Sequence, residues 1–384
     1  MWTHIASNAL TLLIAVLVVA GGVVAWGQLQ YTQPGPLSQA ICLRVESGSN
    51  MRRVSEELDE RGAITSPEIF RISAEYGDRT GSLKAGSFLI EEGASMEEIV
   101  EVVTVGGQST CGTEVVYRIG VTSQELQVRE LDPSTNRFME VAAFDPAEEE
   151  APEPYLSVRE ESDTRYRVAL AEGATSWQIV EALKQADFLE GDVPEVPAEG
   201  SLAPDSYEVR AGASRGDLLD RMSTAQTARL AAVWDARDPD LPIDTPEEAL
   251  ILASLIEKET GVAEERETVA SVFVNRLRQG MRLQTDPTVI YGITKGQGTL
   301  GRGLRRSELD RETPYNTYRI DGLPPTPIAN PGLASLEAAV NPGESDYLYF
   351  VADGTGGHTF SRTLAEHNEA VARWRAIEAE RASQ

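Results

Sequence analysis

The chain has 384 residues, which is enough for two or three domains that each bury an apolar core. Its formal net charge is −27, from 61 acidic and 34 basic side chains. A surface this acidic repels phosphate backbones, and no Lys/Arg stripe interrupts it, so we expect no nucleic-acid partner. Charge does not distinguish between fold classes, which have to be predicted from patterns along the chain.

Near the N-terminus, residues 9–26 form an uncharged apolar run, ALTLLIAVLVVAGGVVAW. About 18 such residues are close to the minimum for a helix that crosses a bilayer, and Trp2 and Trp26 flank the run as interfacial anchors do. A cleaved signal peptide is the alternative, but the run is long for one and no small-residue cleavage site follows it. We predict a single transmembrane helix at 9–26 after a short cytoplasmic tail at 1–8.

Orientation and redox compartment follow from what comes after this helix. No Lys or Arg precedes Arg44, but long polar domains are translocated largely regardless of charge. We therefore expect the C-terminal body to lie outside the cytoplasm. The only cysteines, Cys42 and Cys111, both follow the span. In an oxidising compartment they could form a disulfide, and two free buried thiols are the alternative.

One local pattern occurs four times: an extended segment, a glycine turn with Ser, Thr or Asn, and an amphipathic helix. The copies lie at 43–62, 88–103, 167–185 and 206–222, and Ser95, Thr175 and Ser214 can cap their helices. The first two copies, with a further helix at 67–76, predict a β-α-α-β-α unit over residues 40–108. This unit resembles a LysM-like α/β module, the kind that lies along glycan chains. A plain spacer domain is the alternative.

Residues 109–163 are predicted to be an insertion. Short alternating segments over 115–144 are typical of β-hairpins. The following DPAEEEAPEPY, at 145–155, is acidic and proline-rich, which favours a solvated linker over a packed element. We assign no chemistry to this region.

Residues 165–384 are predicted to form the main domain. Thr245, Pro246 and Glu248 form a strong helix start, with Thr245 as N-cap and Glu248 three residues later. That helix is expected to end at Gly261, and a second helix covers 264–279. Short strands, Gly/Pro turns and a final helix at 363–382 follow. The pattern predicts a mixed α+β domain, not a repeating βαβ sheet.

Glu257 is the candidate general acid. It lies near the end of an apolar helix, where burial and the negative end of the helix dipole both raise a carboxyl pKa. Glu259, two residues later, points in another direction and is expected to be more exposed, so the two cannot act as a facing pair. Ordinary surface glutamates before a helix end are the alternative.

Two polar clusters could line a groove. Gln284, Thr285, Asp286 and Thr288 precede an apolar Val-Ile-Tyr, and Tyr315-Asn316-Thr317-Tyr318 offers stacking faces and an amide. Such side chains suit sugar hydroxyls and N-acetyl groups, although an Asx turn at Asp286 explains the first cluster equally well. The chain has no zinc-ligand spacing, no Gly-x-Ser-x-Gly and no phosphate-binding loop. We therefore expect neither a metal nor a cofactor.

Taken together, these segments resemble the endolytic murein transglycosylases of the YceG/MltG type. The matching segments are ASLIEKET (253–260), the run from 265 to 292, ETPYNTY (312–318), GLPPTPIANPG (322–332) and the run from 347 to 368. They cover most of residues 245–370, and the family's anchor and LysM-like module fall where this chain has its span and its 40–108 unit. LAPDSY resembles the family's Pro-Asp-Thr-Tyr site with Ser206 in place of Thr.

The resemblance implies a periplasmic lyase in the cell inner membrane that cleaves peptidoglycan strands between N-acetylmuramic acid and N-acetylglucosamine. It places the catalytic glutamate at Glu257, which would protonate the bridging oxygen and then deprotonate the C6 hydroxyl to close a 1,6-anhydro ring. One carboxyl serves both steps, so no second carboxylate is required. By position, the groove candidates are Gln284, Asp286, Tyr315 and Asn316, with Asp205 and Tyr207 as a pair on the opposite lip.

Two other functions stay open on the sequence. A hydrolytic muramidase would use Glu257 with Asp286 as its second carboxylate, and a non-catalytic glycan-binding anchor would rely on the LysM-like unit. The anchor and the family also lead us to expect action on newly made glycan, which would terminate or trim nascent chains beside peptidoglycan synthases.

Overall fold

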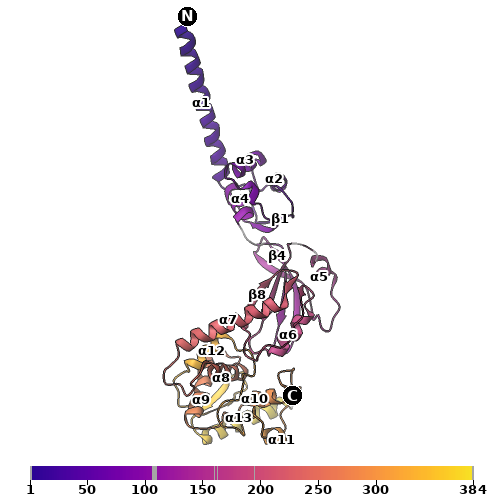
Figure 1. Cartoon of the computed structure of the whole chain (residues 1–384), viewed down its shortest axis with the longest axis vertical. Helices are drawn as coiled ribbons and strands as arrows, with labels where there is room; N and C mark the ends of the chain where they lie inside the picture. Colours follow the sequence, from indigo (N-terminus) through magenta and orange to yellow (C-terminus); the bar gives the residue numbers. More distant parts are fainter. Residues whose placement is uncertain (1, 106–109, 160, 162, 194, 383–384) are drawn as a thin grey trace. The chain divides into compact units, whose positions relative to one another are not determined.

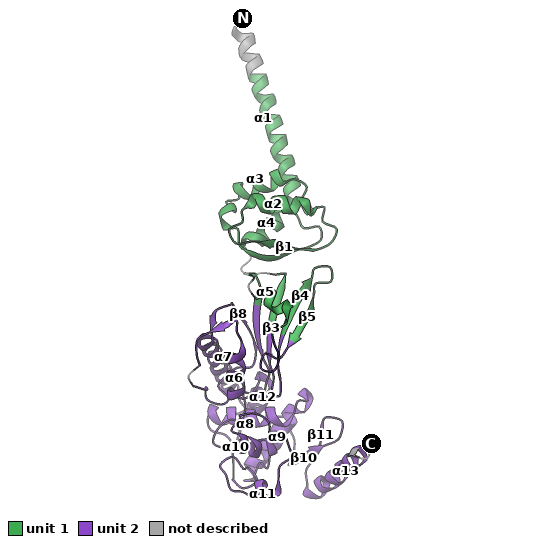
Figure 2. Cartoon of the chain, turned by 90° about the vertical axis from the view of Figure 1, so that its right-hand side faces the viewer, with its two compact units in different colours: residues 1–115, 127–143, 151–165 green, residues 116–126, 144–150, 166–384 purple. Residues whose placement is uncertain are grey.

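The computed structural model describes residues 2–105, 110–159, 161, 163–193 and 195–382, with side chains from residue 10 onward (Figure 1). Helices and strands mix throughout, so the predicted α+β class is confirmed. The chain forms two compact units (Figure 2): unit 1 comprises Met1–Val115, Gln127–Ala143 and Ala151–Arg165, and unit 2 comprises Val116–Leu126, Phe144–Glu150 and Tyr166–Gln384.

The apolar N-terminal run forms one helix, α1 (Trp2–Thr32). Its segment Leu10–Thr32 has a mean hydropathy of 2.4 and none of it is buried, so by length and composition it could cross a membrane. The helix is longer than predicted at both ends: residues 2–8 continue it, and it stops only before Pro34, which cannot extend a helix. Near its end, Tyr31 packs on the apolar core of unit 1.

The elements after α1 follow the predicted β-α-α-β-α order. They are β1 (Ile41–Val45), α2 (Met51–Glu60), α3 (Pro67–Tyr76), a 3-10 turn (Thr80–Ser82), β2 (Gly86–Ile90) and α4 (Met96–Val105). β1 and β2 are antiparallel, with Leu43 opposite Phe88, and both side chains are buried. Residues 106–109, where the predicted unit ends and the predicted insertion begins, lie outside the described residues. The likeness to LysM stays a prediction.

Cys42, on β1, and Cys111 form a disulfide, with their Cα atoms 5.7 Å apart and a separation of 69 positions in sequence. The N–H groups of Thr110 and Cys111 both donate to the Ser87 carbonyl, at 2.8 and 3.1 Å. The bridge therefore ties the segment after α4 to the two-stranded sheet of the β-α-α-β-α unit.

A five-stranded sheet follows, and three of its strands come from residues 109–163, which the sequence predicts to be an insertion. Its strands are β3 (Thr113–Ile119), β4 (Gln124–Asp132), β5 (Arg137–Phe144), β6 (Arg165–Leu170) and β8 (Ser206–Val209), in the order β5-β4-β3-β6-β8. The predicted hairpins are present, but β3 lies between β4 and β6, and Ala171 donates to the Ile119 carbonyl at 2.9 Å. These strands are part of the main sheet, because strand pairing depends on partners that local alternation does not identify.

The predicted solvated linker also contains a packed element. A short helix, α5 (Glu153–Val158), starts after Pro152, and Tyr155 is 1% exposed. Proline suits the start of a helix, and one buried aromatic ring can hold a short segment in place. The proline and the tyrosine are both visible in the sequence, but the acidic, proline-rich composition around them favoured the prediction of a linker.

The rest of unit 2 is mainly helical. Its elements are α6 (Ser176–Gln185), β7 (Leu189–Glu190), β9 (Ala213–Ser214), α7 (Arg215–Asp235), α8 (Pro246–Glu259), a 3-10 turn (Ala263–Glu265), α9 (Arg266–Arg278), α10 (Asp286–Thr294), α11 (Arg306–Leu309), α12 (Leu333–Val340), β10 (Tyr349–Ala352), β11 (His358–Ser361) and α13 (Leu364–Ala382). The N-caps predicted at Ser95, Thr175 and Ser214 all accept the expected backbone N–H.

Helix α8 is the centre of this core. Its capping box at Thr245 and Glu248 is present as predicted, and the helix ends at Glu259, two residues before the predicted Gly261. Its residues from Ile251 to Ile256 are all buried, and it packs against α7, α9, α10 and α12. Each fully buried Leu or Ile contributes roughly 1.5–3 kcal/mol, so this helix is a rigid base for whatever its last turn carries.

We predict that removing the disulfide selectively destabilises unit 1. Closing a loop of this length restricts the unfolded chain, so Cys42→Ser with Cys111→Ser should lose roughly 2–4 kcal/mol. Limited proteolysis should then cut the β-α-α-β-α unit before it cuts the α8 core. Equal protection of the double variant, the reduced chain and the native chain would contradict this.

Candidate active site

The last turn of α8 carries two carboxyl groups that reach different neighbours. The backbone N–H of Gly332 donates to Glu257 Oε2 at 3.0 Å, and the hydroxyl of Thr285 donates to Glu259 Oε1. Residues two apart on a helix point about 200° apart, so the prediction that these two do not face each other agrees with the structure. Both side chains are half-buried, which corrects the expectation that Glu259 is the more exposed.

Glu257 has an acidic neighbour that the sequence did not indicate. A Cβ on Gly332 would lie 1.7 Å from Glu172 Oε1, so the Glu172 carboxyl lies against the glycine that binds Glu257. Burial, followed by the negative charge of Glu257, raises the pKa of Glu172. Glu172 belongs to the third copy of the turn motif, AEGAT, which by its local pattern predicts only the start of a helix.

A partly buried network lies next to Glu257 along α8. Lys258 Nζ donates to the Gly173 carbonyl at 3.2 Å, and burial lowers the pKa of Lys258 although Glu257 and Glu199 oppose this. Glu199 accepts from the Ser176 N–H at 2.8 Å and from the Tyr291 hydroxyl at 3.2 Å, and burial raises its pKa. These contacts connect α6, α8 and α10.

Glu259 lies beside the first predicted polar cluster. Thr285 is 2% exposed, its N–H donates to Thr317 Oγ1 at 3.0 Å, and Thr317 shares a hydroxyl hydrogen bond of 2.9 Å with Thr288. Burial raises the pKa of Glu259, and the charge of Asp286 adds to that rise. The Thr285 hydrogen bond and the positive charges of His358 and Arg276 oppose it, but burial is the largest cause.

Asp286 and Gln284 are the sequence neighbours of Thr285, which binds this carboxyl group. Asp286 begins α10, and its Oδ1 accepts from the Tyr318 hydroxyl at 2.7 Å, which together with burial raises the pKa of Tyr318. Gln284 is exposed and has φ of 49°, a left-handed conformation that few non-glycine residues adopt. Its N–H donates to the Thr317 carbonyl at 3.1 Å, which holds this turn in place.

Tyr315 and Asn316 play different parts. Tyr315 is half-buried, its hydroxyl shares a 2.8 Å hydrogen bond with Thr326, and its ring centroid is 5.2 Å from that of Tyr291. Asn316 is fully buried, and its Nδ2 donates to the carbonyls of Glu308, Leu309 and Arg311. Its amide nitrogen therefore forms hydrogen bonds that stabilise the loop that carries Tyr315 and Tyr318. Asn316 supports the predicted groove and does not line it.

Asp205 and Tyr207 lie on the other sequence segment expected at the site. Asp205 is paired with Arg229, whose positive charge partly opposes the rise in the pKa of Glu172. Tyr207 is 8% exposed and its hydroxyl donates to the Ala203 carbonyl at 2.8 Å. Its ring and hydroxyl thus serve packing within the fold.

His358 is a site residue that the sequence analysis did not assign. The glycine-rich GTGGH joins β10 to β11, and its His358 lies beside Glu265, with 2.7 Å between Nδ1 and Oε2. The positive charge of His358 acts on Glu259. Among the described residues, no group of three or more His, Cys, Asp and Glu could hold a metal ion.

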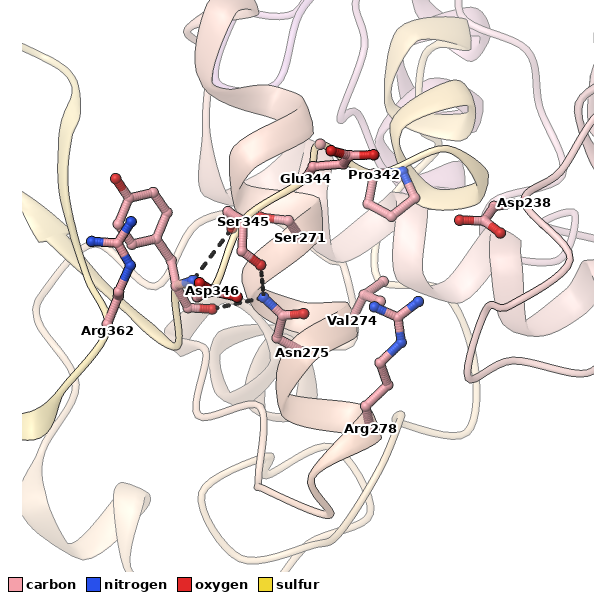
Figure 3. Close-up of a pocket in the computed structure, with 12 residues that line it drawn as sticks. Asp238, Ser271, Val274, Asn275, Arg278, Pro342, Glu344, Ser345, Asp346 and Arg362 are labelled. Carbon is pink, nitrogen blue, oxygen red and sulfur yellow. Dashed lines mark hydrogen bonds between the residues drawn. The ribbon is translucent and has the colours of Figure 1, made fainter.

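A pocket of about 540 Å³ lies elsewhere in unit 2 (Figure 3). It is formed by one face of α9 and the segment 342–347, where Asn275 donates to the carbonyls of Ser345 and Tyr347. None of the residues lining it is a predicted site residue, so its size alone does not make it the active site.

The geometry defines an α+β protein with carboxyl groups presented from the end of a buried helix. Residues 146–373, more than half of the chain, match the YceG-like family, and the chain belongs to that family. A protein named endolytic murein transglycosylase from Bacillus subtilis (strain 168) is 29% identical over 336 residues, which are 86% of this chain and 83% of that protein.

A protein of the same name from Streptococcus pneumoniae serotype 2 (strain D39) is 27% identical over 85% of this chain, which spans only 58% of that longer relative. A YceG-like protein from Listeria monocytogenes with a crystal structure is 26% identical, with a TM-score of 0.46, over 86% of this chain and 99% of that one.

We predict that Glu259 makes stability depend on pH in a defined direction. Its raised pKa means that the folded chain holds this proton more tightly than the unfolded chain. The stability is therefore greatest below the unfolded pKa and falls as pH rises through the folded value. Glu259→Gln removes this loss, so its stability relative to the native chain should increase from about pH 4 to about pH 8 in urea unfolding.

The matched control is Glu247→Gln on the exposed first turn of the same helix. A carbon-13 NMR titration should also find the Glu259 carboxyl above its ordinary pKa of 4.5. A titration at or below that value would contradict the prediction.

We also predict that Asn316→Ala is a stability variant. It leaves three partly buried carbonyls without their donor and should cost about 1–3 kcal/mol. Thermal unfolding measures the loss, and Asn316→Asp tests whether donors are needed, since a carboxylate supplies none. Unchanged stability in both variants would show that the amide does not hold this loop.

Proposed function

We propose that this chain is a membrane-anchored peptidoglycan lytic transglycosylase whose proton donor is Glu259. Family membership and the names of the relatives support the reaction class. The single observation that carries the proposal is the half-buried Glu259 side chain, whose carboxyl is bound by Thr285, feels the charge of Asp286 and has its pKa raised by burial.

This proposal assigns the acid to a residue other than Glu257, which the sequence favoured. Glu257 accepts a hydrogen bond from the Gly332 N–H, which holds the loop before α12. The Glu172 carboxyl packs against the same glycine. Glu259 instead lies among the residues predicted to bind sugar, and its pKa is raised as a general acid requires. Glu257 and Glu172 then act as positioning residues for that loop.

The chemistry needs one carboxyl that works twice. Glu259 donates its proton to the oxygen that bridges N-acetylmuramic acid and N-acetylglucosamine, and the C1–O bond breaks. The resulting carboxylate removes the proton from the C6 hydroxyl, whose oxygen attacks C1 and closes the 1,6-anhydro ring. Glu259 recovers its proton and no water is consumed. Thr285 orients the carboxyl, and burial raises its pKa, which favours the protonated form that the first step needs.

The anchor and the disulfide suggest where this happens. Helix α1 would cross the inner membrane and leave the chain after it in the periplasm, where the Cys42–Cys111 bridge is stable. A β-α-α-β-α unit next to the membrane would hold glycan strands, as LysM-like modules do. Cleavage there would terminate or trim nascent chains close to the synthases that make them.

A hydrolytic muramidase is the second candidate. The charge of Asp286 acts on Glu259, so a second carboxylate lies within electrostatic range. Asp286 would then activate a water, and the products would carry reducing ends without the anhydro ring. Asp286 is held by Tyr318, which favours a role in binding.

We predict that Glu259→Gln lowers strand cleavage by about 10²- to 10⁴-fold while strand binding persists, because only proton transfer is lost. Glu257→Gln is the matched variant on the same turn and should retain most of the activity. The measurement is mass analysis of purified glycan strands treated with the full chain in detergent.

Anhydro ends from the native chain indicate the lyase, and reducing ends indicate the hydrolase. Loss of cleavage in Glu257→Gln but not in Glu259→Gln would return the acid to Glu257. No cleavage by the native chain would leave a glycan-binding anchor.

A further inference from the structure

A second depression in unit 2, of about 300 Å³, has no part in the proposed reaction. Three segments line it: residues 119–124 at the turn between β3 and β4, residues 145–148, and one face of α6 that includes Trp177 and Gln185. Trp177 is half-exposed and Gln185 is exposed. We call this depression the Trp177 pocket.

The walls of the Trp177 pocket are held by hydrogen bonds. Gln124 accepts from the Tyr117 hydroxyl at 2.8 Å and donates to Asp145 Oδ1 at 3.0 Å. Gln178 donates to the Val121 carbonyl at 2.8 Å, which fixes the turn against α6. The polar groups are therefore oriented before a ligand arrives, which lowers the entropic cost of binding.

Two donors in the pocket are left for a ligand. In the part of the chain that the structure describes, neither the Trp177 indole nor the Gln185 amide has a hydrogen-bond partner. Trp177 also supplies a large apolar surface. A tryptophan with a solvated edge combines apolar contact with one N–H donor, and such residues are enriched in binding sites.

The charge of the pocket selects against anions. Asp145, Glu148 and Glu181 line it, and none of its described lining residues is basic. Carboxylates accept hydrogen bonds from hydroxyl groups and repel phosphates and carboxylates. The pocket in Figure 3 differs, because Arg278 and Arg362 line it together with acids. A neutral ligand with hydroxyl and amide groups and one apolar face fits the Trp177 pocket.

Helix α6 also links this pocket to the active site. Its N-cap Thr175 donates to the Gly296 carbonyl, just beyond α10, at 2.6 Å. The turn before it carries Gly173, where a Cβ would be 3.6 Å from both Glu257 Cγ and Lys258 Cδ. The pocket and the last turn of α8 are thus built on packed elements of one compact unit.

We propose that the Trp177 pocket is a secondary saccharide subsite that binds a neutral N-acetylated sugar. Naming the sugar as part of a glycan strand rests on the proposed function, but the pocket's preference for neutral saccharides does not. Binding a sugar away from the bond that breaks contributes equally to the ground state and the transition state, so the subsite acts on KM and not on kcat.

The test uses the full chain in detergent with nitrogen-15-labelled tryptophan and tri-N-acetylchitotriose as the probe. The Trp177 indole signal, assigned with Trp177→Phe, should shift on titration. Trp177→Ala should bind the trisaccharide about tenfold more weakly in calorimetry. Ala147→Trp fills the pocket without removing a contact and should weaken binding similarly. Trp374→Phe, on α13, is the matched control and should bind normally.

Each outcome decides one point. An unmoved Trp177 signal overturns the subsite, as does unchanged affinity in Ala147→Trp, even if Trp177→Ala fails to fold. Strand cleavage by the native chain without a Trp177 shift rejects the subsite and keeps the enzyme. A Trp177 shift without any strand cleavage keeps the subsite and rejects the enzyme.

Discussion

The site depends on the burial of α8. From Ile251 to Ile256 every residue of this helix is buried, so a ligand can meet the helix only at its ends, and the last turn carries Glu257 and Glu259. Carboxyl groups placed there cannot be fully hydrated, and they must be satisfied by neighbours or stay protonated. Glu257 is satisfied by a neighbour, because it accepts a hydrogen bond from the Gly332 N–H. Glu259 accepts one hydrogen bond from the Thr285 hydroxyl and has a raised pKa.

This arrangement costs stability at neutral pH. Burial raises the pKa of three carboxyl groups in unit 2, Glu172, Glu199 and Glu259, in a chain whose net charge is already −27. Ionising a buried acid opposes folding, so these groups are retained against a thermodynamic penalty. Glu199 has a structural role, because its carboxyl accepts hydrogen bonds from Ser176 on α6 and from Tyr291 on α10 and so links the two helices. Glu259 has Thr285 of the polar cluster as its hydrogen-bond partner, and a compromise between stability and activity is expected if it is the proton donor that we propose.

The two halves of the site differ in how they are held. Around Glu259, hydroxyl groups of Thr285, Thr288 and Thr317 form a compact buried set at the start of α10. Around Glu257, the partners are backbone groups and charges on the turn before α6 and the loop before α12. A threonine hydroxyl can donate to a carboxylate or accept from a carboxylic acid, so it tolerates both protonation states. The first half is therefore suited to proton transfer and the second to positioning.

The sequence by itself determined the apolar span, the capping box at Thr245, the β-α-α-β-α order and the α+β class. Each of these depends on residues a few positions apart, whose spacing and capping chemistry act locally. It also showed that Glu257 and Glu259 diverge, since helical geometry requires it. Only the tertiary structure decided which of the two meets the polar cluster, because Thr285 is 26 residues from Glu259 and Gly332 is 75 from Glu257. The pairing of β3 with β6 and the burial of Asn316 could not be predicted from the sequence for the same reason. Hydrogen-bond partners and exposure depend on segments that are distant in sequence and meet only in the folded chain.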